Sequence, residues 1–147
     1  MWDVTITNLI AIILSLISLG ISLKNYLTNK KFQLRQDRNN LYYKLNECFD
    51  AFWTLQHFGL KEYDKNIFYE LISDFHKSLL VNEFIFSEKD LEILKDLDTY
   101  MIAFTDSMDE EKKRYYDTDE ANEDEVYYIM MQREEVKKIF AKYLKFK

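Results

Sequence analysis

The side chains best suited to chemistry in this 147-residue chain are its two histidines and its single cysteine. Helical di-metal proteins use Glu-x-x-His pairs on facing helices, and neither His57 nor His76 has a glutamate three residues before it. We expect His76 at the edge of a core and His57 in the last turn of a helix, where a cation suits the helix dipole. Cys48 lies in an apolar stretch with no histidine close in sequence, which favours a buried structural cysteine over a nucleophile.

Carboxylates gather in the segment 117–122, where Asp117, Asp119 and Glu120 have a spacing that resembles a calcium loop. The segment lacks the glycine that such a loop needs at its turn, so a solvated acidic turn is the better interpretation. The chain also has no glycine-rich phosphate loop, no serine nucleophile elbow and no zinc-ligand spacing. These patterns predict no enzyme, no metal and no cofactor. The net charge of −6 argues against nucleic-acid binding, which requires a basic surface.

The longest apolar feature is Val4–Leu23, a run of residues without a formal charge that is rich in Leu and Ile. At ~1.5 Å per residue, a helix of this length spans ~30 Å, the hydrocarbon thickness of a bilayer. The main alternative is a cleaved signal peptide, which needs a basic segment before the apolar run and a small-residue cleavage site after it. Neither is present, so residues 1–24 are predicted to be a retained transmembrane anchor.

Charge flanking the span predicts its orientation. Only Asp3 precedes it as a charged side chain, whereas the basic residues just after it are Lys24, Lys30, Lys31, Arg35 and Arg38. Lys and Arg near a span remain on the cytoplasmic side. We therefore expect a single-pass protein of the cytoplasmic (inner) membrane with its N-terminus outside and residues 25–147 in the cytoplasm.

A stripe of small and polar residues runs along the span at alternating steps of three and four, and its members are Asn8, Ala11, Ser15, Ser18 and Ser22. Asn25 and Asn29 continue the series. Membrane helices pack closely and hydrogen-bond to one another through such faces. The alternative is that each serine bonds to its own backbone. The regular spacing favours self-association of the span into a homo-oligomer.

The remainder of the chain has the apolar periodicity of helices. A heptad-like, coiled-coil-type stripe through Leu34, Leu41, Leu45, Cys48, Phe52 and Leu55, reinforced by Phe49 and Trp53, predicts that the first helix continues to about residue 58. Gly59 suits the end of that helix. Asp64, Ser87 with Asp90, and Asn122 with Glu125 predict the starts of three more helices, and Phe86 is placed to staple to Leu91. The expected core includes Phe52, Leu71, Leu97 and Phe140.

The predicted fold is all-α, with one N-terminal transmembrane helix continuous with a cytoplasmic antiparallel four-helix bundle. In that topology the basic end of the last helix points back to the membrane. It would form a membrane-surface basic cluster of Lys24, Lys30, Lys31, Lys142, Lys145 and Lys147. Basic residues at a helix end also suit the helix dipole, and that simpler explanation suffices alone.

Three segments carry a resemblance: Arg38–Leu45 after the span, Phe84–Leu91 in mid-chain, and Ile139–Leu144 near the end. Their order resembles that of a group of small, uncharacterised single-span bacterial membrane proteins with a cytoplasmic helical domain. The resemblance implies that same architecture and, because some such proteins are encoded near phage-defence or mobile genes, a role in phage defence. It implies no catalytic residue.

From these features we expect a membrane-anchored, non-enzymatic helical module that binds a protein partner or senses a signal at the cytoplasmic membrane face. Its partners would be the lipid bilayer, other copies of itself and a further protein whose identity the sequence does not specify. The alternative is a homo-oligomeric, membrane-active effector in which Asn8, Ser15, Ser18 and Ser22 line a pore.

Overall fold

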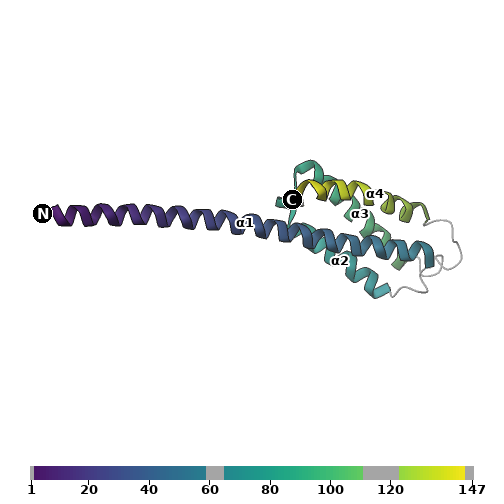
Figure 1. Cartoon of the computed structure of the whole chain (residues 1–147). Helices are drawn as coiled ribbons and strands as arrows, with labels where there is room; N and C mark the ends of the chain where they lie inside the picture. The colour runs from purple at the N-terminus through teal and green to yellow at the C-terminus, as the bar shows by residue number, and fades with distance from the viewer. Residues whose placement is uncertain (1, 59–64, 111–122, 145–147) are drawn as a thin grey trace. The chain divides into compact units, whose positions relative to one another are not determined.

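The computed structural model describes residues 2–58, 65–110 and 123–144, and every regular element in these ranges is helical (Figure 1). The elements are α1 (Trp2–Phe58), α2 (Lys65–Val81), the short 3-10 helix η2 (Glu83–Ile85), α3 (Glu88–Glu110) and α4 (Glu123–Tyr143). The predicted all-α class with a long apolar N-terminal helix is confirmed. The predicted helix boundaries at Gly59, Asp64 and Asn122 lie outside the described residues, as does the predicted acidic turn at 117–122.

The chain divides into two units, Met1–Gln36 and Asp37–Lys147. The first unit consists of the N-terminal part of α1, in which every side chain from Thr5 to residue 33 is exposed. No proline interrupts this stretch, and Leu, Ile and Ala favour the helical backbone. Within the described residues, α1 is the one helix whose length and apolar composition are sufficient to cross a membrane, and none of its most apolar stretch is buried.

The second unit has an aromatic core to which three helices contribute. The ring of Phe52 from α1 lies 4.9 Å from that of Phe68 in α2 and 5.3 Å from that of Phe104 in α3, both in edge-on geometry. All three side chains are buried. Edge-to-face packing contributes roughly 0.5–1.5 kcal/mol per pair beyond the burial of apolar area. This cluster therefore joins α1, α2 and α3.

A second aromatic cluster brings in α4. The Phe140 ring lies 4.8 Å from that of Tyr42 in α1 and 5.4 Å from that of Phe86, which precedes α3. The Phe86 ring also lies 5.3 Å from that of Tyr143. Phe86, for which we predicted a staple to Leu91, thus packs on the aromatic side chains of α4.

The predicted core faces are largely those observed, with exceptions at their edges. Leu34 and Leu55 of the predicted α1 stripe are only half-buried. Phe52, Leu97 and Phe140 are buried as expected, and so is Ile72, but its neighbour Leu71 is only half-buried. Trp53 is 44% exposed, because it lies at the margin of the buried face of α1 and stacks on the His57 ring at 4.2 Å.

Candidate functional site

The five residues predicted to mediate self-association lie on one face of α1. At ~100° per residue they fall within an arc of about 80°, and the side chains of Asn8, Ala11, Ser15, Ser18 and Ser22 are all exposed. We call this surface the span stripe. The rest of the circumference carries eleven Leu and Ile residues between Ile6 and Leu23, each about half exposed or more. A polar stripe on an otherwise apolar helix is the arrangement that membrane helices use to contact one another.

The six residues of the predicted basic cluster are distributed over both units. Lys24, Lys30 and Lys31 are exposed in the unit Met1–Gln36, and Lys142 belongs to the unit Asp37–Lys147. Lys145 and Lys147 lie outside the described residues. Lys142 has a specific partner that the sequence pattern did not indicate, because its Nζ lies 2.7 Å from Oδ1 of Asp90. The membrane-surface cluster stays a prediction.

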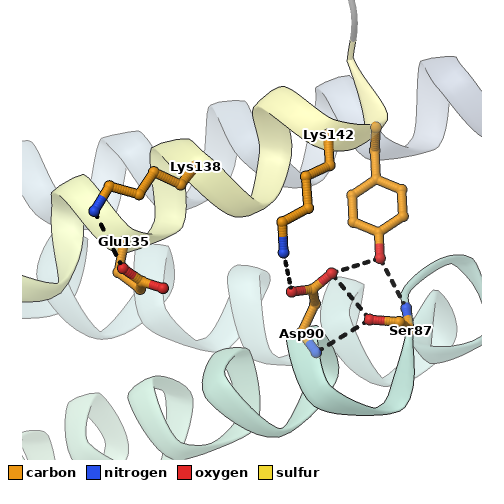
Figure 2. A network of polar contacts seen from close by, with 6 residues as sticks. Ser87, Asp90, Glu135, Lys138 and Lys142 are labelled. Atoms are coloured by element: carbon orange, nitrogen blue, oxygen red, sulfur yellow. Dashed lines mark hydrogen bonds and ion pairs between the residues drawn. The ribbon is translucent and has the colours of Figure 1, made fainter.

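Asp90 is the centre of the densest polar network in the described part of the second unit (Figure 2). Its Oδ1 accepts a hydrogen bond from Lys142 Nζ, while its Oδ2 accepts bonds from the Tyr143 hydroxyl at 2.7 Å and the Ser87 hydroxyl at 2.9 Å. The Asp90 side chain is only 5% exposed. A buried carboxylate needs such partners, since charge-assisted hydrogen bonds offset its loss of hydration.

The network completes the helix cap at the start of α3 in an unexpected way. Ser87 Oγ accepts the Asp90 backbone N–H at 3.3 Å, as a capping box requires. In the usual box the acidic side chain would return a bond to the Ser87 N–H. Here the Ser87 N–H donates to the Tyr143 hydroxyl at 2.9 Å, and that hydroxyl donates to Asp90. A residue of α4 thereby closes the cap of α3.

Arg38 of α1 contacts the same region, at the start of α3 and the end of α4. Its Nε and Nη2 donate to the Ile85 carbonyl at 3.3 and 2.9 Å, and its guanidinium carbon lies 4.7 Å from the centre of the Tyr143 ring. Cation–π contacts of this kind contribute roughly 0.5–2 kcal/mol. Together, Arg38, Ser87, Asp90, Lys142 and Tyr143 form what we call the Asp90 knot, which ties α1, the start of α3 and the end of α4.

The pKa of Asp90 is lowered from its ordinary value, chiefly by the hydrogen bond from Lys142 and further by those from Tyr143 and Ser87, although burial acts against them. The same ion pair raises the pKa of Lys142. Both groups are therefore held in their charged forms at neutral pH. A carboxylate in this state, with every oxygen bonded, is suited to holding helices together and not to accepting a proton.

Asp98 in α3 is a second buried carboxylate, and its pKa is shifted in the opposite direction from that of Asp90. Its Oδ2 lies 2.6 Å from Nδ1 of His76 in α2, while its buried Oδ1 has no hydrogen-bond partner within the described residues. Burial raises the pKa of Asp98, and the hydrogen bond from His76 opposes that rise. His76 is partly exposed, as expected for a residue at the core boundary.

Cys48 is fully buried in α1, as the sequence predicts, and its Sγ donates to the Leu71 carbonyl at 3.5 Å. Burial is the main cause that raises its pKa to about 12, and the negative charges of Glu47 and Asp98 add to this effect. The thiol is therefore protonated at neutral pH. Because the thiolate is the nucleophilic form, this environment disfavours covalent chemistry at Cys48.

Sequence reasoning missed the Asp90 knot and the His76–Asp98 pair as tertiary contacts. Asp90 and Asp98 occur at core positions of α3, since they share the four- and three-residue steps of Leu94, Leu97 and Met101. A charged residue within an apolar stripe requires a partner. The position of these two aspartates could therefore have predicted that each forms a buried polar contact. The partners could not be read from spacing because Lys142 and Tyr143 lie more than 50 residues away in the chain.

Within the described ranges, no group of three or more His, Cys, Asp or Glu side chains is placed to hold a metal ion. The calcium-loop-like segment 117–122 lies outside those ranges. No protein-family model, no curated protein and no solved structure matches this chain. Its candidate functional surfaces are thus the apolar α1 with its span stripe and the helical unit organised by the Asp90 knot.

Proposed function

We propose that the chain is a single-pass membrane protein whose α1 anchors a non-enzymatic helical module at the cytoplasmic face of the membrane. The observation that supports this most directly is that none of the most apolar stretch of α1 is buried. Moving its eleven exposed Leu and Ile side chains out of water is favourable by roughly 15 kcal/mol or more. A bilayer provides that environment over the required length.

The module that we propose is an antiparallel four-helix bundle, and the order of its contacts supports this. Along α1, Lys44 bonds to Ser78 and Cys48 bonds to Leu71, so that α2 residue numbers fall as α1 numbers rise. Contacts between the other neighbouring helices run in the same order and support the proposal. They are Tyr42–Phe140 and Asp50–Arg133 for α1 and α4, His76–Asp98 and Tyr69–Thr105 for α2 and α3, and Asp90–Lys142 and Tyr100–Tyr128 for α3 and α4.

A binding role suits the exposed side chains of the module better than a catalytic one. The rings of Tyr100 in α3 and Tyr128 in α4 lie 4.7 Å apart while both side chains remain exposed, and Tyr127 and Met131 of α4 are exposed as well. Tyr and Met are enriched where proteins bind one another. By contrast, both oxygens of Asp90 are hydrogen-bonded, and the Cys48 thiol is buried.

The span stripe supports self-association as part of the same function, because exposed hydroxyl and amide groups in hydrocarbon gain from pairing across helices. It also favours one alternative, in which several copies arrange the polar groups of Asn8, Ser15, Ser18 and Ser22 around a pore. The two functions differ in whether the assembled spans conduct ions.

A measurement of membrane potential distinguishes the anchored module from the pore. In cells that produce the intact chain, a potential-sensitive dye should report the same potential as in cells that produce a fragment beginning at Asp37, because closely packed helices leave no water-filled path. Matched protein levels and an ionophore-treated sample calibrate the comparison. Collapse of the potential by the intact chain alone would overturn the anchored-module proposal and support the pore.

A further inference from the structure

The segment of α1 that follows the span has an uneven distribution of charge. Between residues 24 and 36 the charged side chains are Lys24, Lys30, Lys31 and Arg35, and all of them are basic. The same segment carries Asn25, Asn29, Phe32 and Gln36, which are uncharged and exposed. Phe32 is the most notable of these, because a large apolar side chain beyond the apolar run is 68% exposed to solvent.

These four uncharged residues continue the spacing of the span stripe. Asn29 and Gln36 extend the row that contains Asn8, Ser15 and Ser22, in which successive members are seven residues apart. In the same way, Asn25 and Phe32 extend the row that contains Ala11 and Ser18. None of the four basic residues of the segment occurs on either row. Two adjacent rows with a seven-residue repeat are the contact positions of a left-handed coiled coil.

We infer that these two rows form one parallel, in-register interface with a second copy of this chain, which extends from the span to Gln36. The inference rests on the proposed self-association of the span, and it lengthens that contact by about 20 Å beyond the membrane. In it, Phe32 meets Phe32 of the second copy and is removed from water, while Asn25, Asn29 and Gln36 each meet the same residue.

The side chains of the two rows favour a second copy of this chain as the binding partner. An amide group both donates and accepts hydrogen bonds, so Asn and Gln pair with themselves when two copies face each other in register. Single asparagines at such positions are known to set the register and the number of chains. An acidic protein partner would instead contact Lys24, Lys31 and Arg35, which lie off the two rows. Like charges across an identical parallel contact would repel, and the rows avoid them.

Disulfide trapping tests this interface in the full-length chain in native membranes. The variants are Asn29→Cys on a row, Lys31→Cys off both rows, and Ser15→Cys within the span. A disulfide requires Cα atoms less than about 7 Å apart, so Asn29→Cys should form on the order of tenfold more disulfide-linked dimer than Lys31→Cys under mild oxidation. The parent chain, whose Cys48 is buried, gives the background.

Each result distinguishes the longer interface from the self-association on which it rests. Dimer formation by both Ser15→Cys and Asn29→Cys, with little by Lys31→Cys, is the expected outcome. Efficient trapping of Ser15→Cys, with Asn29→Cys no better than Lys31→Cys, would overturn the extension beyond the membrane and retain association in the span. Background levels for both row variants would overturn the extension and the proposed self-association together.

Discussion

Truncating Phe52 to alanine should lower the free energy of unfolding of the Asp37–Lys147 unit by about 3–5 kcal/mol. Phe52 is fully buried, and its ring contacts those of Phe68 and Phe104 at 4.9 and 5.3 Å, so that its removal leaves a cavity where three helices meet. Small domains have total stabilities of roughly 5–15 kcal/mol. The loss is therefore a large part of the whole.

The measurement is urea unfolding of a fragment beginning at Asp37, followed by circular dichroism. We expect the parent fragment to unfold cooperatively, because this unit has its own core. Tyr43→Ala is the matched control, since it removes an aromatic ring from an exposed position on the same helix and should leave the midpoint nearly unchanged. Equal midpoints for Phe52→Ala and the parent would show that the assigned core is wrong.

Replacing Asp90 with asparagine should destabilise the same fragment by on the order of 2 kcal/mol at neutral pH, the range for hydrogen bonds to a charged group. The amide keeps the shape of the side chain but removes the charge that Lys142 pairs with and one of the acceptor oxygens. Glu134→Gln is a close control because Glu134 also accepts a lysine hydrogen bond at 2.7 Å, from Lys137, but is 72% exposed. Its stability should match the parent, as exposed ion pairs contribute little.

The pH dependence of this difference provides a second readout. Because the folded-state pKa of Asp90 lies below its ordinary value of 3.8, its contribution is present above that pH and is lost as the pH falls through the folded-state pKa. The stability gap between the parent and Asp90→Asn should therefore narrow on acidification below about pH 4. A gap that is absent at neutral pH, or that widens in acid, would contradict the role assigned to the Asp90 knot.

Local patterns in the sequence were sufficient to predict the helices and most of the core. Leu41, Leu45 and Phe52 recur with helical periodicity and are buried, because the buried face of a helix is set by the same periodicity. Errors occur at the margins of that face. Trp53 and Leu71 lie at its edges, where the exposure of a side chain depends on how closely the neighbouring helix approaches.

Contacts between distant segments were beyond the reach of sequence patterns. Ser87 and Asp90 were recognised as a helix start because the cap is local, but the Tyr143 hydroxyl that completes it comes from the other end of the unit. Likewise, nothing in the spacing of His76 indicates that it bonds to Asp98. For the span stripe the spacing was evident in the sequence, but the partner would be another molecule and is absent from the structure of a single chain.

The central claim is that α1 crosses the membrane once and holds the helical module in the cytoplasm, and a pair of topology reporters tests it most directly. One full-length fusion carries alkaline phosphatase after Lys147, which is active only outside the cytoplasmic membrane. The other carries a green fluorescent protein that becomes fluorescent only in the cytoplasm. The basic residues after Leu23 and their absence before the span predict fluorescence in the membrane fraction and an inactive phosphatase. An active phosphatase fusion with a dark fluorescent one would contradict the account.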